Sequence, residues 1–368
     1  MKNLTITAAR TSFYNAVKHY KRATPPRKIQ REPWLDFLRG IAAVCVVLCH
    51  ATESVYQFNP DFFAKQTLLS QTFAFAAFTL GRTGVPVYFF LTGYLLLDRK
   101  YDARSCAAFW KNNLLPLWIC TEIWNALYLS FLHLFWGTPW DWAEFFNCLG
   151  FNSITPMPHT WYLPVALGTY LLLPFAAKAV QSFPPKTFIL PAAIVILCCF
   201  RFPGEPKSVL LDLSWSGYAY GALILFGYFV KKGCFRKIKT KYAAIASAIF
   251  FAATVACSFF SYLCTGGENL WYNWIPLILF SCSVCILCSR FPNLGRSAFF
   301  QAAAKYSFAV YLLHYPLKII LERFLPQISC LPAGVLLLTA LSLLFSAAAA
   351  RILNQIPRFG KTFFLIKY

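Results

Sequence analysis

Ten apolar runs of roughly membrane-spanning length constrain this chain more than any other feature of its sequence. A transmembrane helix needs about 20 consecutive apolar residues, and 58% of this chain is hydrophobic while only 13% is charged. The runs lie approximately at 34–57, 71–97, 114–136, 161–178, 187–201, 213–230, 242–264, 271–289, 306–325 and 332–352. Long apolar helices satisfy their own backbone hydrogen bonds inside a bilayer. The sequence therefore predicts an all-α integral membrane protein, with about ten transmembrane helices in one bundle.

The basic residues are distributed unevenly among the segments that join these runs. The chain carries a formal net charge of +21, and most of its 34 Lys and Arg fall in every second segment, beginning with residues 2–31. This alternation follows the positive-inside rule and predicts that both termini are cytoplasmic. Membrane topology accounts for the positive charge, so the expected partner is membrane lipid and no nucleic acid is expected.

Three parts are expected along the chain. Residues 1–33 form a basic cytoplasmic N-terminal segment, 34–352 form the transmembrane domain, and 353–368 form a short basic cytoplasmic tail. The first part contains Glu32 as its only acid, which fits a cleaved organellar targeting peptide or an interfacial segment on anionic lipid; we favour the second. Most of the 14 cysteines lie within apolar runs, where Cys behaves as a small hydrophobe. No Cys/His spacing predicts a zinc site, and no metal is expected.

Two polar side chains share one face of the first predicted span. Arg39 and His50 lie eleven positions apart, which on a helix is about 16 Å along the axis and about 20° around it. A neutral imidazole is a suitable general base for a hydroxyl, and Glu53 lies three residues further on, where it can orient the ring. The structural alternative for His50 is a buried histidine that bonds to a neighbouring helix.

Two arginines within spans carry similar alternatives. Arg39 either pairs with Asp36 and anchors the helix near the interface, or contacts a ligand or a negative charge that develops in a reaction. Arg82, at the second span, either extends outward to the interface or pairs inward with Glu53 or with an acceptor.

The later spans contain further polar and aromatic candidates. His314 lies beside Tyr311 and either binds an acceptor or serves as a packing histidine. His159 and Trp161 lie at the predicted outer mouth, where an aromatic face can stack on a sugar. An interfacial aromatic belt is the competing explanation for the tryptophan.

Four segments, in this order, resemble the membrane acyltransferase 3 family of bacterial integral-membrane O-acyltransferases. They are Leu-Asp36-Phe-Leu-Arg39-Gly-Ile-Ala followed by His50; Arg82-Thr-Gly-Val-Pro-Val-Tyr-Phe-Phe-Leu-Thr-Gly93-Tyr94-Leu-Leu; His159-Thr-Trp161-Tyr-Leu; and Lys305-Tyr-Ser307-Phe-Ala-Val-Tyr311-Leu-Leu-His314-Tyr-Pro316. Within that family, the chain is most similar to short single-domain enzymes such as the enterobacterial common antigen O-acetyltransferase. It departs from the family pattern at Thr92, where a serine is usual, and at Lys111-Asn112-Asn113, where the family has an Arg-rich stretch.

The resemblance implies an O-acetyltransferase of the bacterial cytoplasmic (inner) membrane. Its co-substrate would be cytoplasmic acetyl-CoA, with no bound cofactor, and its acceptor a cell-surface polysaccharide or lipid-linked glycan precursor. The expected catalytic residues are His50, Arg39 and Glu53. The expected acceptor-binding residues are Arg82, Tyr94, His159, Trp161, Tyr311 and His314. Basic residues at the inner rim are expected to bind the CoA phosphates: Arg99, Lys100, Arg104 and Lys111.

A different class of protein also fits the composition. Ten spans with intramembrane charges describe a polysaccharide or lipid-linked glycan exporter as well as an enzyme. The spacing of Arg39 and His50 and the lack of internal repeats favour the enzyme. The acyl group could also be succinyl or a longer chain.

Overall fold

The chain folds entirely into helices over the residues that the computed structural model describes, 31–149, 157–191, 193–194, 220–267, 270–325 and 328–366. In chain order the helices are α2 (Pro33–Tyr56), α3 (Pro60–Phe63), α4 (Leu68–Arg82), α5 (Gly84–Leu96), α6 (Ala103–Phe109), the π-helix η1 (Trp110–Leu114), α7 (Leu115–Trp136), α8 (Trp142–Cys148), the 3₁₀-helix η3 (Pro158–Trp161), α9 (Tyr162–Gln181), the 3₁₀-helix η4 (Pro185–Phe188), α11 (Tyr220–Lys231), α12 (Thr240–Thr265), α13 (Ile275–Cys288), α14 (Ala298–Phe324), α15 (Leu331–Leu353) and α16 (Phe359–Phe363).

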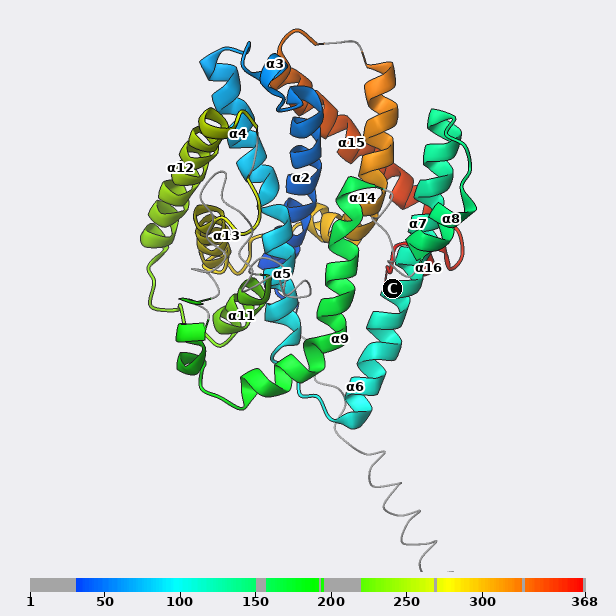
Figure 1. The fold of residues 1–368 in the computed structure, drawn as a ribbon. Coiled ribbons are helices and arrows are strands. Elements are labelled where there is room, and N and C mark those ends of the chain that lie inside the picture. Colours follow the sequence, from blue (N-terminus) through cyan, green and yellow to red (C-terminus); the bar gives the residue numbers. More distant parts are fainter. Residues whose placement is uncertain are drawn as a thin grey trace, which may run out of the picture. The chain divides into compact units, whose positions relative to one another are not determined.

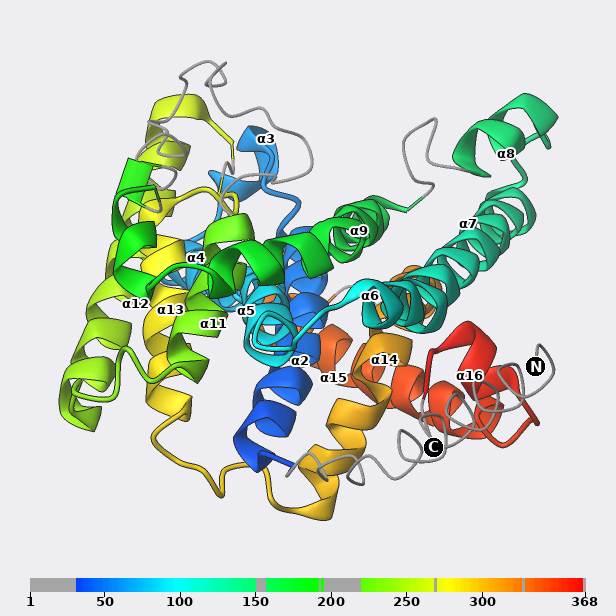
Figure 2. The same ribbon diagram turned by 90° about the horizontal axis from the view of Figure 1, so that it is seen from below.

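Helix α2 forms the centre of the bundle (Figure 1). It packs against α4, α5, α14 and α15. Pro33 occupies its first position and Asp36 its first turn, where proline is pre-organised for a helix and an acid faces the positive end of the helix dipole. Helices α11, α12 and α13 pack on the side of α4 and α5, whereas α7 and α9 lie on the opposite side (Figures 1 and 2). The first predicted span thus becomes the helix around which the others assemble.

Six helical segments in the described part of the chain are long and apolar enough to cross a membrane. They correspond to the predicted spans at 34–57, 71–97, 114–136, 161–178, 242–264 and 332–352. Two predicted spans contain shorter apolar helices, α11 and α13, and the one at 187–201 lies mostly outside the described residues. The count of ten spans and the orientation of the termini stay predictions.

Helix α14 is longer than the predicted span at 306–325. It has 27 residues, which is about 40 Å at 1.5 Å per residue, enough to cross a bilayer. Lys305, Lys318 and Glu322 are among its charged residues, and Lys318 is buried. Charged side chains inside a bundle face its interior or a water-filled cavity, so α14 presents a polar face to the protein.

The helix break between α4 and α5 sets the position of the second span against α2. Arg82 ends α4 and Gly84 begins α5. A Cβ atom added at Gly81 would lie 2.6 Å from the backbone of Cys49, and one at Gly84 would lie 2.6 Å from the carbonyl oxygen of Ala42. Small residues allow helix backbones to approach this closely in membranes. The two glycines therefore hold the end of α4, with Arg82, against α2.

The expected C-terminal tail is folded onto the bundle. Helix α16 packs against α7 and α15, and Phe364 and Ile366 are buried. The indole nitrogen Nε1 of Trp124 donates to the carbonyl oxygen of Phe363 at 2.8 Å. Phe364 and Ile366 therefore pack into the core of the bundle.

Candidate functional site

A histidine, a carboxylate and a guanidinium form a hydrogen-bonded chain between α2 and α4. His50 Nδ1 lies 2.6 Å from Glu53 Oε2, and Arg82 Nη2 donates to Glu53 Oε1 at 3.1 Å. The helix supplies the first contact because residues three apart lie on one face. The side chains of His50 and Glu53 are 12% and 34% exposed, so a ligand has access to this pair.

The partners of His50 determine which ring nitrogen is available for chemistry. A carboxylate that accepts from arginine is ionised and can only accept hydrogen bonds. His50 Nδ1 must therefore carry the proton that it shares with Glu53, and in the neutral ring Nε2 keeps the free lone pair. A base oriented by a carboxylate is a common arrangement for activating a nucleophile.

Arg82 points into the bundle instead of outward. It is buried, and its Nη1 donates to the hydroxyl oxygen of Tyr272 at 3.2 Å. Its guanidinium carbon lies 4.6 Å from the ring centre of Phe78 and 4.8 Å from that of Trp271. Cation–π contacts and the bond to Glu53 thus hold the charge in an aromatic enclosure.

Two buried histidines lie beside His50. The ring of His314 stacks on that of His50 with centroids 5.5 Å apart, and the ring of His159 lies 6.3 Å from His50 and 5.0 Å from His314. His314 Nδ1 donates to the carbonyl oxygen of Tyr311 at 2.6 Å. Four histidines and tyrosines were predicted to bind the acceptor. The structure places three of them near His50, namely His159, Tyr311 and His314.

The tautomer of His159 follows from its bond to Tyr128. The hydroxyl of Tyr128 donates to the carbonyl oxygen of Leu312 at 2.7 Å and lies 3.3 Å from His159 Nε2. Because the single hydroxyl proton is used for the carbonyl, His159 Nε2–H is the donor of the second bond. His159 Nδ1 and His314 Nε2 are buried with no hydrogen-bond partner among the described residues, so both are free acceptors.

A buried lysine near this cluster has no counterpart among the predicted site residues. Lys318 Nζ donates to Ser54 and to Glu322 Oε1, the latter at 3.2 Å, and lies 4.5 Å from the ring centre of Tyr315. The sequence did contain a signal for Lys318, because a charged residue inside a predicted span, four residues after His314, is a candidate functional residue. Tyr128 and Tyr272 had no such signal, because nothing distinguishes them in sequence from the chain's other tyrosines.

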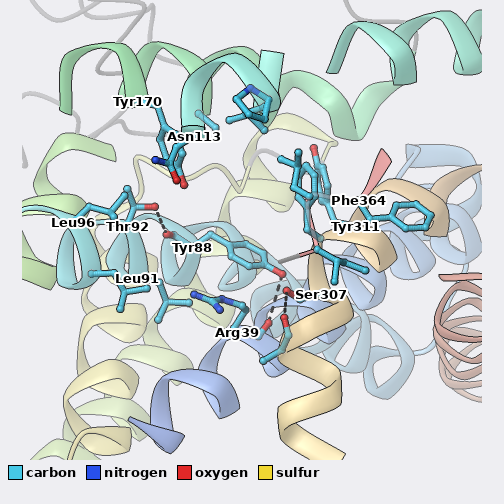
Figure 3. A pocket seen from close by; sticks show the side chains of 18 of the residues that line it. Arg39, Tyr88, Leu91, Thr92, Leu96, Asn113, Tyr170, Ser307, Tyr311 and Phe364 are labelled. Atoms are coloured by element: carbon cyan, nitrogen blue, oxygen red, sulfur yellow. Dashed lines mark hydrogen bonds between the residues drawn. The ribbon is translucent and has the colours of Figure 1, made fainter. Parts of the chain in front are cut away.

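Arg39 lies in an open cavity of about 490 Å³ among α2, α5, α7, α9 and α14 (Figure 3). Four basic residues line it, and none of its described lining residues is acidic: the four are Arg39, Arg99, Lys305 and Lys361. Much of the remaining lining is apolar or aromatic. A cavity with this charge and lining suits an anionic ligand that has an apolar portion.

The predicted CoA-binding residues divide into two groups. Arg99 lines the cavity, whereas Lys100, Arg104 and Lys111 are not among its lining residues. Lys305 and Lys361 line it instead. Lys305 was visible as part of a motif, but nothing in sequence indicated that Lys361 would reach the same cavity.

Tyr311 lies between this cavity and the histidines. It lines the cavity, and its hydroxyl donates to the carbonyl oxygen of His159 at 2.7 Å. Its ring centre is 5.4 Å from that of His159 and 6.1 Å from that of His314. The cavity therefore approaches the histidine cluster at Tyr311, although His50 itself is not a lining residue.

The two remaining predicted acceptor-binding residues lie apart from the cavity lining. Tyr94 packs edge-on against Trp34 with ring centres 5.1 Å apart, within the hydrophobic core. Trp161 lies against Trp271 and Tyr272, with ring centres 5.5 Å and 5.3 Å away. Since Tyr272 bonds to Arg82, Trp161 is connected to the histidine–carboxylate chain and Tyr94 is not.

Cys49, His50 and Glu53 place one ligand atom each within 4.8 Å of one another. Both oxygens of Glu53 already accept hydrogen bonds, from His50 and from Arg82. A cation bound here would lie close to the fixed positive charge of Arg82, whose Nη2 is 3.1 Å from Glu53 Oε1, and would be repelled by it. The charges at this group thus favour proton transfer over metal binding.

Comparisons with known proteins identify the family of the chain. The model of the family described as "Acyltransferase domain" matches residues 32–351. The chain is 30% identical over 180 residues to "Acyltransferase MdmB" of Streptomyces mycarofaciens, an alignment that covers 44% of this chain and 43% of that protein. The chain thus matches less than half the length of this curated relative. No solved structure matches the chain. The family match spans the histidine–carboxylate chain and every motif that resembles the acyltransferase 3 family, and the chain belongs to this acyltransferase family.

Proposed function

We propose that this protein moves an acyl group, in its main reaction acetyl, from cytoplasmic acyl-CoA to a hydroxyl of a cell-surface polysaccharide or lipid-linked glycan precursor. The bacterial cytoplasmic membrane is the proposed location, with both termini inside. The observation that carries the proposal is the adjacency of two features at Tyr311: a cavity lined by four basic residues and a histidine whose Nδ1 is held by a carboxylate.

His50 would act through Nε2. The acceptor hydroxyl gives its proton to Nε2 as its oxygen bonds to the thioester carbonyl carbon, and the C–S bond breaks to release the CoA thiolate. The thiolate then takes this proton from Nε2 and leaves as free CoA, which returns His50 to its neutral form. In a two-step version, Nε2 is acylated first and the hydroxyl attacks the acyl-imidazole. Glu53 would stabilise the positive imidazole in either route, and Arg82 would hold Glu53 in place.

The cavity would hold the acyl-CoA. Arg99, Lys305 and Lys361 supply positive charge for the phosphates, and the arm would extend along the apolar lining toward Tyr311. Arg39 would contact the arm or the developing oxyanion. The cavity's charge supports this assignment, since an anionic donor needs cations without competing carboxylates.

The acceptor would approach from the side of Glu53 and Arg82. His159 and His314 would shape the acceptor site from behind His50, since their rings lie 6.3 Å and 5.5 Å from that of His50, and the ring of Trp161 offers a face for a sugar. Membership of an acyltransferase family favours this reaction over export of the glycan without chemistry.

The first test is transfer of radiolabelled acetyl from acetyl-CoA into the glycan fraction of membrane vesicles. Wild type, His50→Ala and His133→Ala are compared at matched expression. His133 is a suitable control because it lies at the end of α7, where it contacts its own loop at Thr138. Label is expected with wild type and His133→Ala and should vanish with His50→Ala. Transfer that persists in His50→Ala would refute the proposed role of this residue.

Release of free CoA thiol separates the enzyme from an exporter. The enzyme is expected to release thiol from acetyl-CoA in the presence of the vesicle glycans, and an exporter releases none. Absence of both thiol release and label would overturn the proposal.

A further inference from the structure

The residues that follow α15 form a short segment wedged into the bundle. Within it, Arg358 and Leu365 have positive φ angles of 65° and 52°, a region in which the backbone turns sharply. Trp124 and Cys120 of α7 both bond to the carbonyl oxygen of Phe363, at 2.8 Å and 3.2 Å. The segment is thus fastened to α7 by its backbone and does not depend on side-chain packing alone.

One face of this segment lines the cavity that contains Arg39. Lys361, Phe364, Leu365 and Ile366 are lining residues. Phe364 and Ile366 are buried, whereas Thr362 points away and is exposed. Phe364 and Tyr311, which line the same cavity, are both labelled in Figure 3. The segment therefore forms part of the cavity wall at the level of Tyr311.

The cavity lining that adjoins the segment is apolar. Leu365 packs against the cluster of Leu117, Ala166 and Leu167, and Phe308 joins the same cluster. Phe308 also stacks on Tyr311 with ring centres 6.1 Å apart. The charged lining residue on the segment, Lys361, precedes this apolar stretch in sequence. Leu365, Leu117 and Ala166 thus form one continuous apolar part of the cavity wall, which suits contact with a short acyl chain.

We infer that Phe364 and Leu365 determine the length of the acyl chain that this protein transfers, by closing the cavity between α7 and α14. The inference rests on the proposed function, because it assigns the acyl end of the donor to the Tyr311 side of the cavity. It extends that function by naming a wall that is contributed from outside the predicted spans. A short donor fits behind this wall, and a longer chain collides with Leu365.

The expected effect is a change in the ratio of rates with different donors. One methylene too many or too few in an apolar pocket changes kcat/KM roughly 10- to 200-fold. Leu365→Ala removes most of one side chain from the wall and should lower the ratio of acetyl to butanoyl transfer at least about tenfold. Ala166→Leu adds bulk to the same apolar part of the wall, beside Leu365, and should raise this ratio.

The experiment measures thiol release by vesicles supplied with acetyl-, butanoyl- or hexanoyl-CoA. The variants are wild type, Leu365→Ala, the conservative Phe364→Leu, Ala166→Leu and the control Thr362→Ala. The control alters the same segment on its exposed side and should keep the wild-type ratio. Because ratios are compared, a variant that folds in smaller amounts still gives an interpretable result.

The outcomes distinguish this inference from the proposed function. Wild-type protein that uses none of the three donors would overturn the proposed function itself. Wild-type protein that uses acetyl-CoA, with the same donor ratio in Leu365→Ala, Phe364→Leu and Ala166→Leu, would overturn only the role of the segment. Opposite shifts in Leu365→Ala and Ala166→Leu would support it.

Discussion

His50 and Glu53 lie one turn apart on α2, and the imidazole Nδ1 is 2.6 Å from the carboxylate oxygen Oε2. This single contact fixes the tautomer of the ring and leaves Nε2 as its free base. The second oxygen of Glu53 accepts from Arg82, so the orientation of the base depends on two helices. The hydrogen bonds of Glu53, the cavity and the packing of the helices can each be tested by substitution.

Glu53→Gln should lower the rate of acetyl transfer about 10²- to 10⁴-fold, the range of general acid–base contributions. The amide oxygen can still accept from His50, but the negative charge that stabilises the imidazolium is lost. Initial rates of CoA release from vesicles measure the effect. Glu144→Gln, an exposed position on α8, should retain the wild-type rate. Equal rates for wild type and Glu53→Gln would show that Glu53 does not support the base.

Arg82→Ala should reduce both activity and stability. The change removes the bond to Glu53 and the contacts with Phe78 and Trp271, and we expect a loss of about 1–3 kcal/mol. Thermal unfolding in detergent, followed by tryptophan fluorescence, measures it. Arg82→Lys keeps the charge but not the planar fork, so it should fall between wild type and Arg82→Ala.

The matched control for Arg82 is Arg351→Ala, at an exposed position near the end of α15. It should leave the unfolding temperature close to that of wild type, because surface substitutions usually change stability by less than about 0.5 kcal/mol. An equal loss in both variants would mean that the buried contacts of Arg82 contribute nothing specific.

Lys361→Ala should raise the KM for acetyl-CoA about fivefold with little change in kcat. Removing one charge from the cavity wall weakens an ion pair with a donor phosphate, which contributes up to about 1 kcal/mol when partly exposed. Steady-state kinetics over a range of acetyl-CoA concentrations test this. Lys111→Ala, at a residue that does not line the cavity, should raise KM less. A larger increase in KM for Lys111→Ala than for Lys361→Ala would instead support the CoA-binding residues predicted from sequence.

Gly227→Ala should destabilise the packing of α11 on α5. The added Cβ would lie 2.1 Å from the carbonyl oxygen of Phe90, so the helices must move apart, at a cost of about 1–3 kcal/mol. Gly221→Ala, on the same helix, meets nothing within 4 Å and should be neutral or slightly stabilising. Thermal unfolding of the two variants compares them. A smaller loss of stability in Gly227→Ala than in Gly221→Ala would contradict the proposed close packing of α11 on α5.

Local features of the chain were predictable because they depend on residues close in sequence. Apolar length predicted the long helices, and helical periodicity predicted that Glu53 would lie beside His50. The motifs also identified the family over most of the chain. The structure adds that α14 begins at Ala298, earlier than its apolar run, because residues 298–305 include four alanines, the residue with the highest helix propensity.

Features that join distant residues were beyond such reasoning. The close approach of α4 to α2 at Gly81 is evident only from the packed structure. That packing decides whether Arg82 turns inward or outward. Tyr272 and Tyr128 became partners of Arg82 and His159 through contacts across the bundle. Hydropathy carries no information about which helix faces meet, since lipid and protein interior are similarly apolar.

By itself, the sequence determined that this chain is a helical membrane protein of the acyltransferase 3 family, with His50 and Glu53 on one face of its first span. The tertiary structure alone decided which cations share a cavity, Lys305 and Lys361 with Arg39 and Arg99, and that the segment around Phe364 closes its wall. The physical reason is that helix formation depends on neighbours a few residues away, whereas a cavity is formed by side chains from many helices, whose mutual packing no local pattern specifies.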